Sequence, residues 1–285
     1  MSPKNFGTIY TQLKEPRSKL MGILNATPDS FTGDGILSGG KEGVTTALKV
    51  VERFIEQGAD IIDIGGESTR PGAIPVDQET EIKRIVPIIQ AIRARFSIPL
   101  SIDTTKSMVA TAALEVGASI INDVSGLMLD PQMVDVIVES GVPIVIMHSQ
   151  LARAVNQSDH GPLNNDENDI VTNVVSDLER LTVYVISRGV KPHQIILDPG
   201  IGFGKTPLQN LQLIKNLSQL KELGYPVLLG ASRKSFIGHL TGFPIGQRLP
   251  ASLAAAAVAV LQKTDIIRVH DVAETRQVIQ LLETA

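Results

Sequence analysis

Polar and charged residues follow short apolar runs at regular intervals along the chain, at the points where buried strands would end. The set consists of Asn25, Asp63, Asp103, Asn122, Asp123, His148, Asp198, Lys234, Arg268 and His270. Carboxylate and amide oxygens accept hydrogen bonds, whereas lysine and arginine side chains only donate them. Residues of these types, gathered in one pocket, would bind a small polar molecule on several edges at once.

Part of this set suits a flat heterocycle. Asp103, Asn122 and Asp198 would accept hydrogen bonds from ring N–H and amino groups. Lys234 would donate to a ring oxygen or nitrogen from the opposite edge, and Arg268 would stack on the ring by cation–π contact. These residues therefore predict a pocket for a nitrogen-containing ring.

A second group of residues suits an anion beside that ring. Asn25, Arg70 and His270 would hold an anionic group at the rim of the pocket. Ser235 would open a helix whose N-terminus attracts negative charge. A ring pocket next to anion sites indicates group transfer from a phosphate ester that carries the ring.

Some of these residues also have a purely structural interpretation. An Asp after a strand is often the N-cap of the next helix. For Asp63 and Asp123 that interpretation and a role in the site both stay open, and for His148 we expect a hydrogen-bonded structural role. The repetition of polar residues at eight strand ends nevertheless favours a functional set.

Two sequence patterns alternate along the chain, and they predict the strands and helices that position these residues. Short runs rich in Ile, Val and Leu have the length of buried strands: Leu20–Leu24, Asp60–Ile64, Leu100–Ile102, Ser119–Ile121, Ile144–Met147, Gln194–Leu197, Val227–Leu229 and Asp265–Val269. Stretches with helical spacing follow them, such as Lys41–Gln57, Asp77–Phe96, Thr104–Val116 and Asp271–Leu282. Eight such units predict one α/β domain over residues 1–285, a closed (β/α)8 TIM barrel, with an open doubly wound sheet as the alternative. In such a barrel the active site lies at the carboxyl ends of the strands.

Glycine and proline positions agree with these boundaries. Gly58 and Gly117 each stand just after a predicted helix and just before a strand, which is a C-cap position. Pro99, Pro143 and Pro226 stand at strand starts, where a missing N–H costs no ladder hydrogen bond.

Composition narrows the class of protein. The chain has 285 residues with 43% hydrophobic residues, a net charge of −4 and no cysteine. We find no block of lysine and arginine, which argues against nucleic acid as a partner. The apolar run Leu253–Leu261 is too short to span a membrane, and Met1–Pro16 lacks the apolar core of a signal peptide. The sequence therefore predicts a cytoplasmic protein without a membrane partner.

The glycine-rich segment Gly200–Thr206 looks like a phosphate-binding loop. Its spacing fails, because Pro199 stands where that motif requires glycine. We expect instead that these glycines let the loop pass close to a ligand, with Phe203 presented to the site.

Two segments carry a resemblance to a known family. Gly22–Phe31 and Asp63–Gly72 resemble the two signature segments of dihydropteroate synthases. Further matches are Ser101–Thr104, Ile121–Asp123, Asp198–Gly200, Ser232–Phe236 and Arg268–His270. They run in order from the first predicted strand to the last and cover essentially the whole chain. One departure is Thr32–Gly35, where Ser-Asp-Gly-Gly is commoner in the family.

The resemblance implies a reaction of folate biosynthesis. In it, 4-aminobenzoate attacks (7,8-dihydropterin-6-yl)methyl diphosphate by a dissociative displacement, which releases pyrophosphate and 7,8-dihydropteroate. It further implies Mg2+, inhibition by sulfonamides and a homodimer.

The resemblance also assigns roles to residues of this chain. The pterin would contact Asp103, Asn122, Asp198, Lys234 and Arg268. Pyrophosphate would contact Asn25, through Mg2+, together with Arg70 and His270. Aminobenzoate would contact Thr69, Pro71, Phe203 and Ser235, with Pro28 and Phe31 closing over it. Catalysis would depend most on Asp103, Lys234, Arg70 and His270.

Two alternative functions remain. A cobalamin-type, pterin-dependent methyltransferase has a similar barrel, but the Asp-x-His-x-x-Gly signature of cobalamin binding is missing from this sequence. A homologue that binds pterin without turning it over would keep the pocket and lose the chemistry.

Overall fold

The structure, a computed structural model, describes residues 17–27, 40–68, 73–150 and 169–284. Its eight strands are β1 (Lys19–Asn25), β2 (Ile61–Gly65), β3 (Leu100–Asp103), β4 (Ile120–Asp123), β5 (Ile144–Met147), β6 (Ile195–Asp198), β7 (Leu228–Leu229) and β8 (Ile266–Val269). Its α-helices within these ranges are α2 (Gly40–Glu56), α3 (Gln78–Arg93), α4 (Ser107–Glu115), α5 (Met133–Ser140), α7 (Ile170–Ser187), α8 (Pro207–Lys215), α9 (Leu217–Lys221), α10 (Ser235–Thr241), α11 (Leu249–Leu261) and α12 (Val272–Glu283). Each strand is followed by at least one helix, as predicted.

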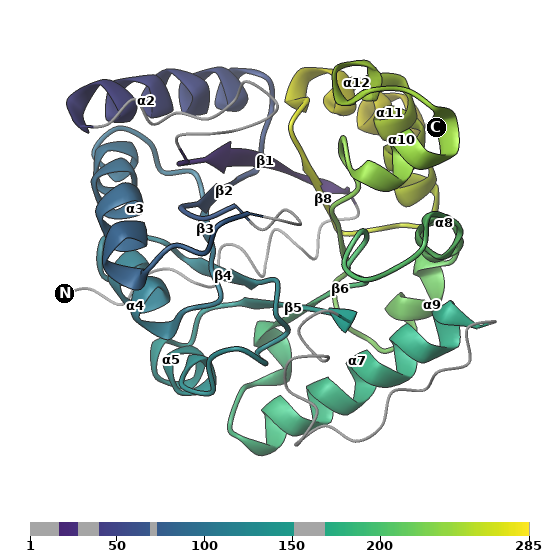
Figure 1. Ribbon diagram of the computed structural model, residues 1–285, viewed down its shortest axis with the longest axis horizontal. Helices are drawn as coiled ribbons and strands as arrows, with labels where there is room; N and C mark the ends of the chain where they lie inside the picture. The colour runs from purple at the N-terminus through teal and green to yellow at the C-terminus, as the bar shows by residue number, and fades with distance from the viewer. Residues whose placement is uncertain (1–16, 28–39, 69–72, 151–168, 285) are drawn as a thin grey trace.

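The strands form one parallel sheet that closes on itself. Their order is β6-β5-β4-β3-β2-β1-β8-β7. The two ends of this order are joined, because the backbone N–H of Leu197 donates to the carbonyl of Pro226 at 2.8 Å and Leu197 pairs with Val227. Figure 1 shows the helices arranged around the strands. The predicted (β/α)8 barrel is therefore confirmed, and the open sheet is wrong.

Alternation of side chains along each strand divides the interior from the helix layer. Inside the barrel, every even-numbered strand contributes an isoleucine to one buried cluster: Ile61, Ile120, Ile196 and Ile266. Because side chains of a strand repeat their direction every second residue, the residues two positions later also point inward. Those residues are Asp63, Asn122, Asp198 and Arg268. A polar layer thus lies on an apolar one, toward the carboxyl ends of the strands.

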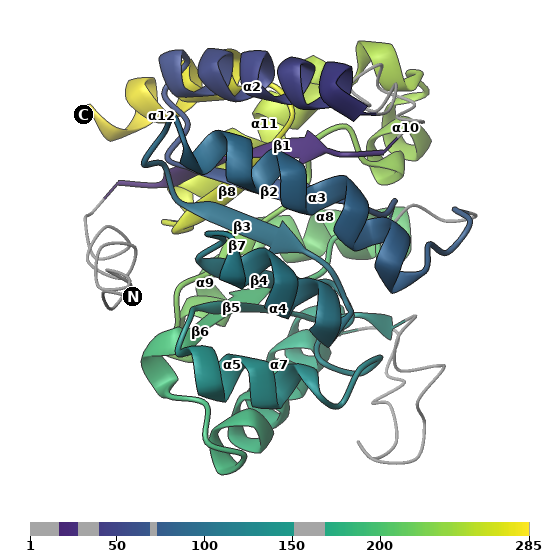
Figure 2. The same cartoon turned by 90° about the vertical axis from the view of Figure 1, so that its left-hand side faces the viewer.

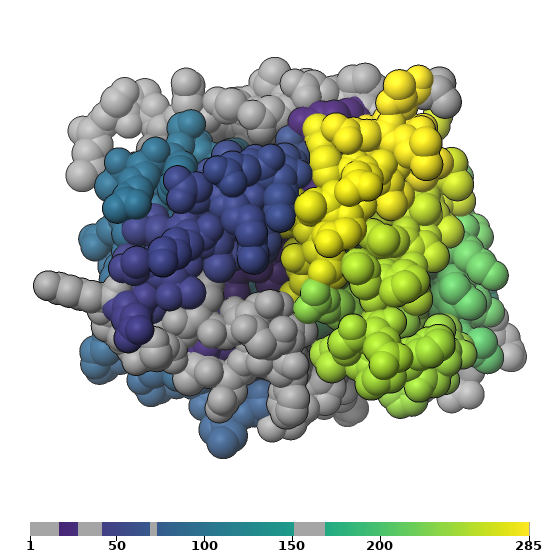
Figure 3. Space-filling view, turned by 90° about the horizontal axis from the view of Figure 1, so that it is seen from above, coloured from purple at the N-terminus to yellow at the C-terminus, as the bar shows by residue number. Residues whose placement is uncertain are grey.

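Residues of opposite parity point outward and pack against the helices. The packing between β1 and the helices is tight at Gly22, where a Cβ would lie 2.8 Å from the ring of Phe54 on α2 and 3.3 Å from Val272 on α12. Figure 3 shows α2 and the C-terminal helix α12 side by side on one face. Figure 2 shows that α2, α3, α4 and α5 follow one another around the outside. The first and last helical units are therefore neighbours, as closure requires.

The glycines and prolines predicted to mark helix ends and strand starts occupy those positions in the structure. Gly58 and Gly117 have positive φ angles of 89° and 122°. Pro99, Pro143 and Pro226 each use only the carbonyl in the sheet, which accepts from Ile62, Ile121 and Leu197. Among the helices of the described ranges, none has the length and apolar character needed to cross a lipid bilayer.

Candidate active site

Arg268 is the centre of the polar layer at the carboxyl ends of the strands. Its Nε donates to Asp63 Oδ2 at 2.6 Å and its second guanidinium nitrogen donates to Asp103 Oδ2 at 2.7 Å. Asn122 donates its amide to the same oxygen of Asp63 at 3.2 Å. Asp63 is fully buried and Asp103 is 7% exposed. The layer is therefore a network of charged and polar side chains from β2, β3, β4 and β8 with little access to solvent.

Two oxygens of this network are buried without a partner in the described part of the chain: Asp63 Oδ1 and Asp103 Oδ1. A buried polar atom of this kind usually has a partner, either in the protein or in a bound molecule. Asp103 is the last residue of β3, and its neighbour on β2 is Gly65, where an added Cβ would be in van der Waals contact with Asp103 Cβ at 3.7 Å. Asp103 Oδ1 is thus an acceptor available to a ligand that donates hydrogen bonds.

The charges of the network alter the acidity of Asp103. Burial raises the pKa of its carboxyl to about 7; Arg268 acts in the opposite direction, while Asp63, Glu81 and Asp123 raise it further. The pKa of Arg268 is raised, because its attraction to Asp63 and Asp103 outweighs the burial that would lower it. Asp103 therefore changes charge near neutral pH, beside a permanent cation.

Asp198 and Lys234 form the other side of the pocket. Asp198 Oδ1 accepts the backbone N–H of Gly200 at 2.6 Å, and burial raises the pKa of its carboxyl against the attraction of Lys234. Lys234 donates from Nζ to the carbonyl of Ile201 at 2.5 Å and lies 4.8 Å from the centre of the Phe203 ring. Burial lowers the pKa of Lys234 to about 8, and Asp198 opposes this shift. Phe203 is thus presented to the site, as expected.

Three further predicted residues lie at the rim. Asn25 is the last residue of β1 and half-buried, in line with the inward-pointing residues of that strand. His270 follows β8, and its Nδ1 lies 3.1 Å from the hydroxyl of Ser232. Ser235 is exposed and begins α10, as predicted.

The remaining predicted site residues cannot be placed in the same way. Pro28, Phe31, Thr69, Arg70 and Pro71 lie outside the described residues.

The structure decides between the two interpretations left open for Asp63 and Asp123, and it shows the surroundings of His148. Asp63 belongs to the site, since it points into the barrel and pairs with Arg268, and the N-cap of α3 is Asp77 instead. Asp123 points outward and accepts the backbone N–H groups of Ser125 and Leu127, so it holds a loop and caps no helix. His148 has the expected structural role, with Nε2 3.2 Å from Asp177.

Sequence reasoning missed the role of Asp63 among the predicted ligands. The signal was present, because Ile61 and Asp63 repeat the spacing of Ile120 with Asn122 and of Ile196 with Asp198. Asp63 differs only in standing two residues before the end of its strand, whereas Asp198 stands at the end.

Lys205 was also missed, within the glycine-rich segment after β6. Its Nζ donates to three backbone carbonyls, those of His148 at 3.1 Å, Gly200 at 2.8 Å and Phe203 at 3.3 Å. Burial lowers the pKa of this amine to about 7. Lys205 therefore links the loop that contains Phe203 with the end of β5. Its amine is used by these backbone carbonyls and does not serve as a phosphate-binding lysine.

Comparison with known proteins agrees with this geometry. The family model described as "Pterin binding enzyme" matches residues 21–270. The dihydropteroate synthase of Clostridium beijerinckii is 43% identical over 268 residues, covering 94% of each chain. A structure of the enzyme from Clostridium difficile, solved in the presence of pteroic acid, has a TM-score of 0.84 and 40% identity, covering 94% of this chain and 96% of that one.

A third relative is the dihydropteroate synthase of Xanthomonas albilineans, solved with 4-aminobenzoic acid. It has a TM-score of 0.83 and 39% identity, covering 95% of this chain and 93% of its own. Because the likeness extends over nearly the full length of both partners in sequence and in fold, this chain belongs to the dihydropteroate synthase family of pterin-binding enzymes.

Proposed function

We propose that the chain joins (7,8-dihydropterin-6-yl)methyl diphosphate to 4-aminobenzoate, with 7,8-dihydropteroate and pyrophosphate as products. The observation that carries this proposal is the buried, unpartnered Asp103 Oδ1 in a layer already neutralised in part by Arg268. An acceptor in this state suits the N–H and amino donors of a pterin edge. Relatives solved with pteroic acid and with 4-aminobenzoic acid support the choice of both substrates.

The two halves of the pocket would bind opposite edges of the pterin. Asp103 and Asn122 would accept from ring donors on one side. Asp198 would accept on another side, where Lys234 would donate to a ring oxygen or nitrogen. Since Arg268 is fixed by two carboxylates, its guanidinium plane is held in a set orientation and is available to the face of the ring.

The charge of the pocket suits a dissociative displacement. As the methylene C–O bond breaks, its electron pair leaves with pyrophosphate and positive character develops on the pterin methylene. Asp63 and Asp103 lie in a buried, fixed arrangement, which is the condition under which charges stabilise a transition state strongly. The amine nitrogen then forms the new C–N bond and loses a proton. Little base catalysis is required, and no side chain is assigned as a general base.

Mg2+ fits the rim of the pocket as an ion that arrives with the substrate. Within the described residues, no group of three or more carboxylate, histidine or cysteine side chains is arranged to hold a metal ion. Mg2+ is commonly bound by one or two protein oxygens together with substrate phosphates and waters. The amide oxygen of Asn25 would supply the protein ligand. When bound, the ion would neutralise charge on the leaving pyrophosphate, alongside Arg70 and His270.

Release of pyrophosphate tests the proposal directly. The protein is mixed with both substrates and Mg2+, and pyrophosphate is measured over time, with a parallel sample that lacks aminobenzoate. We expect release that depends on both substrates. A protein that binds the pterin but releases no pyrophosphate would be the non-catalytic homologue, and the proposal would be wrong. The expected homodimer remains a separate prediction, which sedimentation of the purified protein would test.

A further inference from the structure

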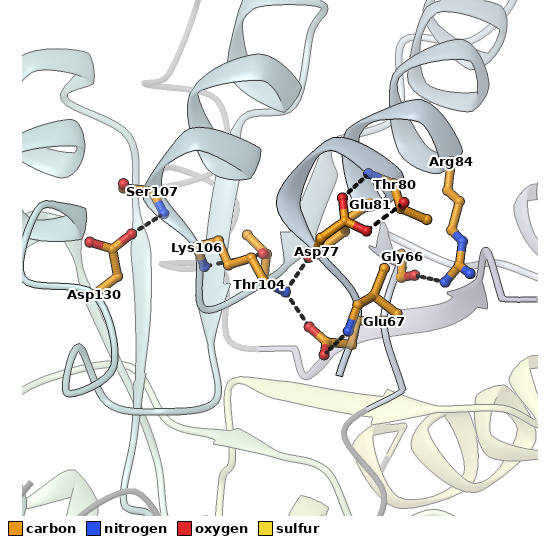
Figure 4. Close-up of polar contacts among 11 residues, drawn as sticks. Gly66, Glu67, Asp77, Thr80, Glu81, Arg84, Thr104, Lys106, Ser107 and Asp130 are labelled. Atoms are coloured by element: carbon orange, nitrogen blue, oxygen red, sulfur yellow. Dashed lines mark hydrogen bonds and ion pairs between the residues drawn. The ribbon is translucent and has the colours of Figure 1, made fainter. Parts of the chain in front are cut away.

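Three charged residues outside the pocket form a compact cluster next to β2 and β3. Lys106, on the connection between β3 and α4, donates from Nζ to Glu81 Oε2 at 2.6 Å and to Glu67 Oε2. Figure 4 shows these side chains meeting from three segments: the end of β2, the start of α3 and the loop after β3. Glu67 is 39 positions and Glu81 is 25 positions away from Lys106 in the sequence. The cluster therefore joins three parts of the chain.

Glu67 also holds together the two ends of the connection between β2 and α3. Its second carboxylate oxygen accepts the backbone N–H of Val76 at 2.9 Å, nine residues further on. Directly after Val76, Asp77 caps α3 by accepting the N–H of Thr80 at 2.9 Å. One carboxylate thus binds Lys106 through one oxygen and the far end of the connection through the other.

Helix α3 also contacts the first residues of the same connection, at Gly66. Arg84 donates to the carbonyl of Gly66 at 2.8 Å. A Cβ on Gly66 would lie 2.8 Å from Glu81 Cγ and 2.8 Å from Ile85 Cγ2, so this residue is pressed against the helix. Glu81 is fully buried, although it is a carboxylate near the start of a helix. Such a residue is rarely buried unless it is paired.

The position of Lys106 is fixed in turn by its own loop. Its backbone N–H donates to Thr104 Oγ1 at 3.3 Å, and the next N–H, that of Ser107, donates to Asp130 at 2.7 Å. The pKa of Lys106 is raised: burial acts against the charged form, and hydrogen bonds to Glu67 and Glu81 outweigh it. The ammonium group is therefore charged and held at a set place.

We propose that Glu67, Lys106 and Glu81 are positioning residues for the second substrate. They fix both ends of the connection from Glu67 to Val76, whose sequence contains Thr69, Arg70 and Pro71. The inference rests on the proposed function, in which those three residues contact aminobenzoate and pyrophosphate. The cluster stands outside the polar layer, and its link to the pterin site is that Glu81 raises the pKa of Asp103. Its loss should therefore impair the aminobenzoate step more than it impairs pterin binding.

The test is Lys106→Met in the full-length protein, which keeps a chain of similar length without its charge. Loss of hydrogen bonds to charged groups corresponds to about a tenfold or larger effect, so the KM for aminobenzoate should rise and kcat/KM should fall by that factor. The chain contains no tryptophan, so pterin binding can be followed by pterin fluorescence with little protein background. The pterin Kd should change much less than the KM for aminobenzoate.

The matched control is Lys83→Met on the exposed side of α3. Lys83 pairs with Glu79 at 3.7 Å, and both side chains are more than three-quarters exposed. Exposed pairs of this kind contribute little, so this variant should match the wild type in every measurement. Lys106→Arg should restore part of the aminobenzoate KM, because a guanidinium can still reach two carboxylates.

A second variant covers the case in which Lys106→Met fails to fold because Glu81 is left buried without a counter-charge. Lys106→Met combined with Glu81→Gln removes that charge as well and should fold, yet Glu67 would still lack its lysine and the aminobenzoate KM should stay high. Wild-type KM for aminobenzoate in either folded variant would overturn the proposal. So would a loss of activity that only follows the folded fraction. A wild-type protein that releases no pyrophosphate would refute the proposed function instead, which keeps the two failures distinct.

Discussion

Replacing Asp63 by asparagine would keep the shape of a fully buried side chain and remove its charge. Asp63 accepts from Arg268 at 2.6 Å and from Asn122 at 3.2 Å, and it is one of the groups that raise the pKa of Asp103 to about 7. The change should therefore have two separate effects. It should weaken the network that holds Arg268, and it should lower the pKa of Asp103.

The size of the first effect follows from what each substitution leaves behind. In Asp63→Asn the amide oxygen still accepts from Arg268, so the loss is about 1–2 kcal/mol of charge assistance. In Asp63→Ala both Arg268 Nε and the Asn122 amide lose their acceptor, which costs about 3–5 kcal/mol. An unfolding entropy of about 2.1 cal/mol/K per residue turns these values into melting-temperature decreases of about 2–3 °C and about 5–8 °C for a chain of this length.

The second effect has a definite sign. The pKa of Asp103 lies above its ordinary value of 3.8, so the folded protein gains a proton there as the pH falls through about 7. The carboxylate that would accept from the pterin is then lost, and affinity should fall by up to about tenfold per pH unit below that point. Without the charge of Asp63, this fall should begin at a lower pH.

Titration of the pterin substrate by fluorescence between about pH 5 and pH 8 measures this shift. The effect of the ligand's own protonation cancels in the ratio of variant to wild-type affinity, because both proteins bind the same ligand. We expect Asp63→Asn to bind more weakly near neutral pH and to lose less affinity on acidification. If pterin affinity begins to fall at the same pH in both proteins, or at a higher pH in the variant, the electrostatic reasoning is refuted.

Three further outcomes follow from the structure. Asp198→Asn should lower pterin affinity about 10-fold to 100-fold, measured by calorimetry, and wild-type affinity would remove Asp198 from the pterin site. Gly200→Ala places a Cβ 1.9 Å from the carbonyl of His148 at φ 69° and should destabilise the fold by about 3 kcal/mol or more, whereas Gly141→Ala, at the same φ in open space, should cost only about 1–2 kcal/mol; equal melting temperatures would contradict the close contact. Sulfonamides, which share the shape and charge of 4-aminobenzoate, should compete with it and not with the pterin substrate, and inhibition that aminobenzoate fails to relieve would count against this.

Much of the architecture could be predicted from the sequence because barrel formation depends on local patterns. Strand runs, helical spacing and the glycines and prolines between them are each read within a few residues. The strand bounds agree with prediction to within one or two residues, as for Lys19–Asn25 against Leu20–Leu24. The inward direction of Asn122 and Asp198 also follows locally, from the two-residue repeat of a strand.

What the tertiary structure decided is which of these groups meet. The pairs of Arg268 with Asp63 and Asp103 span 205 and 165 residues, and they form only because β8 returns beside β1 when the barrel closes. The pairing of β5 with β6 likewise brings Lys205 onto the carbonyl of His148 from a position 57 residues away.

The same holds for the side chains outside the pocket. Asp123 and Asn122 are adjacent in the sequence, so the strand repeat sends them to opposite faces of the sheet. Packing decides what each one meets: Asn122 donates to Asp63, and Asp123 accepts from the loop after β4. In the sequence Lys106 looks like an ordinary loop lysine. Its ion pair exists only because α3 packs beside the loop and places the buried Glu81 next to it. The sequence by itself determined the barrel, the family and the residues that face inward, because these depend on short-range periodicity and on ordered motifs. The pairing of charges was decided by packing alone, since the energy of an ion pair depends on distance and burial that no local pattern records.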